Sequence, residues 1–179
     1  TALAQKHPRS EEVFDGARLV LKVPVLKQDW TTAVMESRKF LAIRGIKETK
    51  LGAELTVILK GSVFQRALAL EKQEKRAEAA DLFLAYHKEF QDDADAPKAL
   101  FNAANNKFRV GKVDEALSAL RIILAQYPNS SLAPNTLYLI ATSYDALGEF
   151  ANSAANYEQL AADVPQSPVT PEALLRAAE

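Results

Sequence analysis

The sequence predicts an all-α protein built as a solenoid of helix-turn-helix repeats. Of the 179 residues, 31 are alanine and 23 are leucine, whereas only 6 are glycine, a composition that favours helices over sheets. Several residue types also recur at a spacing of 37 residues, which is typical of stacked helical hairpins. The chain length suits one domain or one repeat array.

The 37-residue spacing is kept by several sets of positions. Members 37 residues apart are Gly111 and Gly148; Pro97, Pro134 and Pro171; Phe64, Phe101, Tyr138 and Leu175; Phe83, Leu120 and Tyr157; Ala67, Ala104, Ala141 and Ala178; and Ala79, Ala116 and Ser153. A proline suits the first turn of a helix, and a glycine suits the turn that ends one. The small residues mark positions where paired helices approach most closely. Each unit is therefore predicted to be two helices joined by a tight turn.

The N-terminal part departs from this period. Helices are predicted over 10–27 and 28–43, with Pro24 kinking or ending the first, so the range 10–50 is an atypical helical hairpin. A degenerate repeat follows over 51–93, with Glu74 at the place of the turn glycine and Gln91 at the place of the closing proline. Ala33 and Ala79 are 46 residues apart. We therefore expect an insertion around 44–50 or a longer helix over 51–70.

The C-terminal part keeps the period. Full repeats are predicted over 94–130 and 131–167, and the range 168–179 is the start of a further repeat. Leu174 and Leu175 then lack the second helix that would cover them, so we expect this end to fray or to self-associate. On this interpretation the chain is a fragment of a longer protein.

The last full unit resembles the tetratricopeptide repeat. The residues that carry the resemblance are Leu137, Ile140, Ala141, Tyr144, Ser153, Tyr157 and Pro165. The preceding unit keeps most of the pattern but has Lys107 where tyrosine is expected. The resemblance implies a right-handed superhelix whose concave wall is formed by the first helix of each pair, with a partner peptide or helix bound there.

Candidate partner-binding residues follow from that implied geometry. They are Phe64, Leu68, Phe101, Asn105, Phe108, Arg109, Tyr138 and Thr142, on one stripe of the first helices. The aromatic rings would anchor an apolar partner, and the Arg109 guanidinium would meet a carboxylate or an aromatic ring. The alternative is that the aromatic residues pack between adjacent first helices. The lysines of a chaperone-binding carboxylate clamp are absent from the matching positions, which disfavours that role.

The turns between repeats suggest a cellular context. Tyr127-Pro128-Asn129-Ser130 and Val164-Pro165-Gln166-Ser167-Pro168 are similar to the repeat boundaries of bacterial envelope proteins such as BamD and CpoB. This resemblance implies a scaffold in a periplasmic or outer-membrane-associated assembly. The alternatives are a cytoplasmic location and a docking or regulatory region of a longer enzyme or signalling protein.

Other classes of function are disfavoured. The net charge of −1 gives no field that attracts nucleic acid, and no apolar run approaches the length needed for membrane insertion. The absence of cysteine removes thiolate chemistry and Cys-ligated metals. His7 and His87 have no obvious catalytic partner, so no enzyme activity is expected. Asp92-Asp93-Ala94-Asp95 lacks the glycine and glutamate of a calcium loop, so we expect no metal, no cofactor, and a protein or peptide as the partner.

Overall fold

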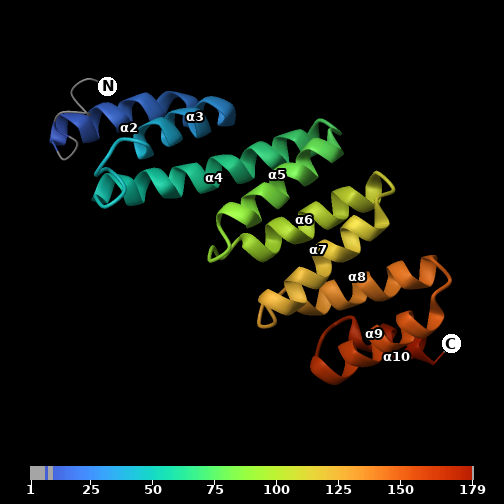
Figure 1. The fold of residues 1–179 in the computed structure, drawn as a ribbon. Helices are drawn as coiled ribbons and strands as arrows, with labels where there is room; N and C mark the ends of the chain where they lie inside the picture. The colour runs from blue at the N-terminus through green and yellow to red at the C-terminus, as the bar shows by residue number, and fades with distance from the viewer. Residues whose placement is uncertain (1–6, 8–9, 179) are drawn as a thin grey trace. The chain divides into compact units, whose positions relative to one another are not determined.

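The computed structural model describes residue 7 and residues 10–178 (Figure 1). All regular structure in this part of the chain is α-helical, so the predicted class of helical hairpin repeats is confirmed. The helices are α2 (Glu11–Leu26), α3 (Trp30–Leu41), α4 (Lys50–Lys72), α5 (Arg76–Glu89), α6 (Ala96–Arg109), α7 (Val113–Gln126), α8 (Ala133–Ala146), α9 (Phe150–Asp163) and α10 (Thr170–Ala177). None of these described helices is long and apolar enough to cross a lipid bilayer.

The chain divides into two compact units, residues 1–74 and residues 75–179. The first contains α2 to α4 and the second contains α5 to α10. The division falls inside the range 51–93, which the periodicity predicts as one degenerate repeat.

In the first unit, α3 packs against both α2 and α4. Pro24 lies in the last turn of α2, and the helix ends two residues later at Leu26, as its helix-ending character predicts. Asp29 then caps α3, because its carboxylate accepts a hydrogen bond from the backbone N–H of Thr32 at 3.1 Å.

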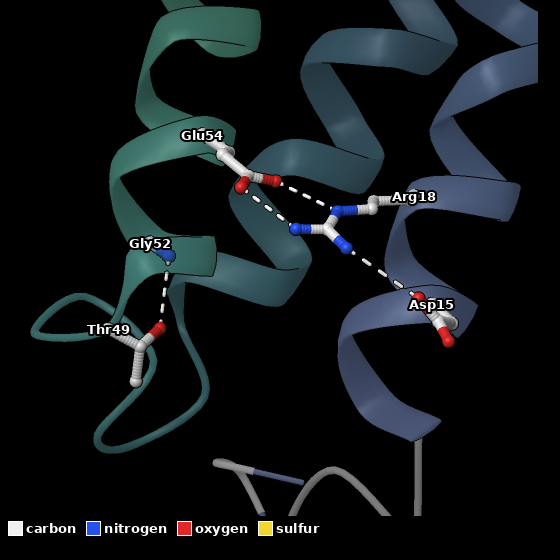
Figure 2. A network of polar contacts seen from close by, with 5 residues as sticks. All are labelled: Asp15, Arg18, Thr49, Gly52 and Glu54. Carbon is white, nitrogen blue, oxygen red and sulfur yellow. Dashed lines mark hydrogen bonds and ion pairs between the residues drawn. The ribbon is translucent and has the colours of Figure 1, made fainter. Parts of the chain in front are cut away.

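The long spacing between the N-terminal hairpin and the repeats has two causes. Residues 42–49 form turns rather than helix, and α4 extends over 23 residues. Thr49 caps α4 by accepting the N–H of Gly52 at 3.1 Å (Figure 2). A side chain at Gly52 would meet the Ile46 carbonyl oxygen at 2.2 Å, so the incoming turn requires glycine there. The two expected explanations, an insertion and a longer helix, therefore both apply.

In the second unit, each helix packs mainly against the next one along the chain. The helices α6 and α7 form one hairpin and α8 and α9 form the next (Figure 1). The small residues of the repeat are buried at the helix contacts: Ala104, Ala116 and Ala141 are fully buried, and Ser153 is 2% exposed. Close packing of paired helices accounts for these small residues.

The turns inside the hairpins share one backbone feature. Gly111 and Gly148 have φ angles of +76° and +73°, in the left-handed region that glycine enters without steric cost. Glu74 stands at the equivalent place between α4 and α5 and has a φ of +60°. Its backbone therefore adopts the same sign of φ without glycine.

At position 107 the sequence has lysine in place of the tyrosine of the tetratricopeptide pattern. This lysine makes two ion pairs in the structure. Its side chain is only 5% exposed, and the ammonium contacts Asp81 of α5 at 2.9 Å and Glu115 of α7 at 2.7 Å. These contacts join three consecutive helices. A tyrosine at this position would remove the cation from Asp81 and leave Glu115 paired with Lys112 alone, at 2.9 Å.

Candidate partner-binding surface

The eight candidate residues lie in both units. Phe64 and Leu68 lie on α4 of the first unit, and the other six lie on α6 and α8 of the second. Phe64 is only 7% exposed and belongs to the core of its unit, whereas Leu68 is half-buried. The accessible candidates that share one compact unit are therefore those on α6 and α8.

On α6, the aromatic candidates are half-buried against the core and the charged candidate is exposed. Phe101 and Phe108 are half-buried and pack against the cluster that contains Leu100, Leu120 and Ile140. Asn105 lies between them in the sequence and is half-buried as well. Arg109, the last residue of α6, is exposed.

Phe101 also lines a hollow of about 350 Å³ beside the turn between the two repeats. Lys98 and Asn102 of α6 line the same hollow, together with Ser131 and Leu132 from the turn. The ring therefore has one edge in the core and one beside open space. This geometry agrees with both interpretations of the aromatic residues, packing and partner contact.

Tyr138 on α8 connects adjacent repeats. Its hydroxyl donates to Oε1 of Glu172 on α10 at 2.7 Å, and this hydrogen bond is the main cause of its raised pKa. The ring meets that of Tyr157 on α9 edge-on, with 5.8 Å between centroids. Tyr138 therefore contacts α9 with its ring and α10 with its hydroxyl.

Thr142, one turn beyond Tyr138, lines a hollow of the second unit. The hollow has a volume of about 820 Å³, lies between α8, α9 and α10, and is lined by Thr142, Asp145, Ala146, Phe150, Ser153, Ala154, Arg176 and Ala177. Asp145 and Arg176 form an ion pair of 3.5 Å across it. Phe150 is 69% exposed. The hollow thus combines an accessible aromatic ring with paired charges.

Sequence reasoning missed Phe150 and the polar character of Ser153. The Ser153 hydroxyl is buried and has no hydrogen-bond partner among the described residues. Burial also raises the pKa of the nearby Tyr157 phenol to about 12. One repeat earlier, Val113 and Ala116 occupy the matching places and pack in the cluster that includes Ile140 and Tyr144 of α8. A comparison of register positions would have found both differences.

A third hollow, of about 560 Å³, lies between the turns that precede α6 and α8. The Tyr127 hydroxyl bridges these turns by donating to the Gln91 carbonyl at 2.8 Å. Asp93, in the former calcium-loop candidate, accepts from the Tyr86 hydroxyl at 2.7 Å and from the backbone N–H of Asp95 at 3.0 Å. These contacts make the acidic segment a turn that is tied to α5. No group of three potential metal ligands occurs in the described part of the chain.

The His87 side chain contacts residues at the end of α7. Its Nε2 lies 3.1 Å from Oε1 of Gln126, and its ring meets that of Tyr127 edge-on. The side chain is buried between consecutive repeats. These contacts do not include a nucleophile or a carboxylate.

The hairpins α6–α7 and α8–α9 match a known family. Residues 98–130 and 135–167 each match the family model of the tetratricopeptide repeat. These two hairpins are tetratricopeptide repeats. Such repeats generally mediate protein–protein interaction. No curated protein matches the sequence. The family assignment therefore rests on the two repeats, which contain six of the eight candidate residues.

Proposed function

We propose that the chain is a protein–protein interaction scaffold that binds a partner peptide or helix on the face of the tetratricopeptide repeats formed by α6 and α8. The supporting observation is the position of Phe101, which is half-buried at a hollow between the repeats. A ring held in place on its inner side can anchor an apolar partner at low entropic cost. Arg109 adds an exposed cation two turns along the same helix.

Binding would use these residues without any chemical step. Apolar side chains of the partner would cover the open edges of Phe101 and Phe108, and a partner carboxylate would meet Arg109. Tyr138 and Thr142 would extend the contact onto α8. The hydrogen bond from Tyr138 to Glu172 would hold its ring in a fixed orientation for the partner.

We further propose a bacterial envelope assembly as the setting, in the periplasm or at the outer membrane. The ground for this proposal is the resemblance of the Tyr127-Pro128-Asn129-Ser130 turn to the repeat boundaries of bacterial envelope proteins. Fractionation of source cells with periplasmic and cytoplasmic markers tests this setting. Recovery with the cytoplasmic marker would favour the docking region of a cytoplasmic protein instead.

Selection from a random peptide library tests the binding face. Peptides that bind the chain should bind the Phe101→Leu, Arg109→Ala variant at least about tenfold more weakly, since an anchor and a charge contact are lost. The matched control, Phe90→Leu, Lys88→Ala, changes a half-buried phenylalanine and an exposed cation at the end of α5 and should leave the affinity unchanged. Circular dichroism establishes that each variant is folded. Equal loss in both variants, or no loss in either, would contradict binding at α6.

A further inference from the structure

The hollow between α8, α9 and α10, called here the α9 hollow, lies at a junction of two helix pairs. At the first junction of this kind, Lys107 of α6 contacts Asp81 of α5 at 2.9 Å. At the second, Tyr144 of α8 packs against the cluster that contains Ala116 of α7, and its hydroxyl accepts a hydrogen bond from Arg121 of α7. Lys107 and Tyr144 are 37 residues apart. At both junctions a long side chain of the following first helix therefore covers the second helix of the preceding pair.

At the junction after α9, the described residues leave the same place open. Ser153 and Ala154 of α9 are in register with Ala116 and Leu117 of α7, which belong to the cluster that Tyr144 covers. Ser153 and Ala154 line the α9 hollow of about 820 Å³ instead. This volume lies within the range of about 300–1,000 Å³ that is usual for binding pockets. The α9 hollow therefore has the position and the size to receive a side chain from another molecule.

The Ser153 hydroxyl is not needed for the packing of the helices. The matching residues of the two earlier pairs, Ala79 and Ala116, are fully buried, so the helix contact requires only a small side chain. Ser153 is 2% exposed, and its hydroxyl has no hydrogen-bond partner among the described residues. A buried hydroxyl without a partner costs free energy. A ligand that places a polar atom in the α9 hollow would remove this cost.

The charged groups at the α9 hollow favour an uncharged ligand. Arg176 contacts Asp145 at 3.5 Å and Glu172 of its own helix at 3.3 Å. Arg176 would repel a cation in the hollow, whereas Asp145 and Glu172 would repel a carboxylate. A neutral hydroxyl group avoids both penalties. It can also accept a hydrogen bond from Ser153 while it donates one to Asp145.

The exposed ring of Phe150 favours an aromatic ligand. Phe150 lines the α9 hollow and is 69% exposed, whereas the residue in register on α7 is Val113. Two aromatic rings in contact attract each other by more than the apolar area that they bury. An aromatic ring that carries a hydroxyl group therefore suits both the ring and the polar groups of the hollow. The matching place one repeat earlier holds such a side chain, Tyr144.

We propose that the α9 hollow binds a tyrosine side chain of the partner peptide or helix. This inference rests on the proposed function, because Thr142 is a candidate partner-binding residue on α8 and also lines the hollow. A peptide that covers Phe101 on α6 and continues across α8 would reach the hollow at Thr142. Its tyrosine ring would contact Phe150, and its hydroxyl would pair with Ser153 and Asp145.

An NMR titration with two neutral amides tests the hollow without any peptide. N-acetyltyrosine amide should shift the backbone resonances of Thr142, Ser153 and Ala177 in the 179-residue chain, with a dissociation constant of about 1 mM. N-acetylphenylalanine amide lacks the hydroxyl and should bind about threefold to tenfold more weakly, because a hydrogen bond is lost. Ser153→Ala should reduce this preference for tyrosine by at least about twofold. Alanine at the two matching positions indicates that this variant folds.

Phe150→Ala tests the aromatic contact. It should weaken the binding of both amides by at least about threefold, because the contact between the rings is lost. Leu175→Ala is the matched control, since Leu175 is 63% exposed on α10 and does not line the hollow. This control should bind both amides as the unchanged chain does. Circular dichroism establishes that every variant keeps its helices.

Peptides selected from the random library test the partner's side of the contact. They should contain a tyrosine whose replacement by phenylalanine weakens binding to the unchanged chain about threefold to tenfold. The same replacement should cost less affinity for the Ser153→Ala variant, since the two changes remove one shared hydrogen bond.

The amide titration and the peptide measurements can fail separately. Absence of saturable shifts at the solubility limit, equal affinities for the two amides, or an unchanged preference in Ser153→Ala would overturn the α9 hollow as a tyrosine site. Peptides that bind through Phe101 and Arg109 but are indifferent to loss of their tyrosine hydroxyl would overturn it as well, and the proposed function would stand. Binding of the tyrosine amide without any peptide binding would contradict the proposed function and exclude a partner's tyrosine as the occupant.

Discussion

The ammonium group of Lys107 lies in the interior of the second unit, where the carboxylates of two other residues contact it. Asp81 and Glu115 are 70% and 49% exposed, so water solvates the outer parts of both carboxylates while their inner oxygens contact the ammonium. The aliphatic stem of Lys107 fills space at the helix contact. Nothing in the sequence indicates this arrangement, since Asp81 lies 26 residues before Lys107 on another helix. The pattern shows only that the tyrosine is missing.

Replacing Lys107 by methionine should change the free energy of unfolding by less than about 1 kcal/mol. Methionine keeps the packed stem, and both exposed carboxylates can be solvated by water once the cation is gone. Lys107→Ala, which removes the stem as well, should cost about 2 kcal/mol. Urea unfolding followed by circular dichroism measures both. An equal loss of stability in the two variants would mean that the charge, not the stem, is what matters.

The same cluster should make stability depend on pH in the acidic range. The hydrogen bond from Lys107, followed by that from Lys112, lowers the pKa of Glu115. A carboxyl whose pKa is lower in the folded than in the unfolded state stabilises the fold above its unfolded value of about 4.3, and this stabilisation is lost as the pH falls. Unfolding midpoints measured from neutral to acidic pH should therefore fall less steeply for Glu115→Gln than for the unchanged chain. Identical slopes would contradict a contribution from this ion pair.

At the scale of the element, the turns within the hairpins depend on one residue with positive φ. In two repeats the sequence has glycine at this place, and the structure shows the left-handed conformation at both Gly111 and Gly148. Glu74 has the same sign of φ, although its side chain makes the conformation less favourable. The missing glycine is therefore accommodated by local strain rather than by a different turn.

Glu74→Gly should stabilise the chain by about 0.5–1 kcal/mol, because glycine relieves the strain at positive φ at some cost in unfolded-state entropy. Gly111→Ala should destabilise it by about 1 kcal/mol for the converse reason. At Gly111 a new Cβ would meet no atom within 4 Å, so backbone conformation alone is tested there. Thermal unfolding measures both shifts, and shifts of the same sign would contradict the argument.

The helix α10 should be the least protected helix of the second unit. It has eight residues, and Leu174 and Leu175 are 55% and 63% exposed. Few buried contacts make local opening easy. Hydrogen exchange should therefore be faster in α10 than in α7, whose Leu120 and Ile123 are fully buried. Equal protection of the two helices would show that the exposed leucines do not weaken α10.

At the scale of the whole molecule, the second unit should fold by itself. Its helices pack mainly against their neighbours along the chain, and its two core clusters consist of its own residues. Stability in such an array is a sum of local terms. A fragment of residues 75–179 should therefore show a helical circular dichroism spectrum and a cooperative unfolding transition. A disordered fragment would mean that the unit needs residues 1–74 to fold.

Periodicity predicts the repeats well because every repeat must solve the same packing problem. The positions of Pro97, Ala116 and Tyr157 in the structure follow directly from their register. The hollow beside Ser153 could not be predicted in this way, since it depends on side chains from three helices and on differences between repeats. The candidate partner-binding residues are an intermediate case. Their positions on the helices can be predicted from the register, but the hydrogen bond from Tyr138 to Glu172 is seen only in the structure.

The neighbour-to-neighbour packing of the second unit also bears on how the protein is made. Each helix packs mainly against the preceding or the next helix, so it can dock without a segment from a distant part of the chain. The hairpin α6–α7 can therefore become compact on the ribosome before α8 has been synthesised, and each later helix can dock on a surface that already exists. Apolar surface is then exposed only at the growing end, which limits aggregation of the nascent chain during its synthesis.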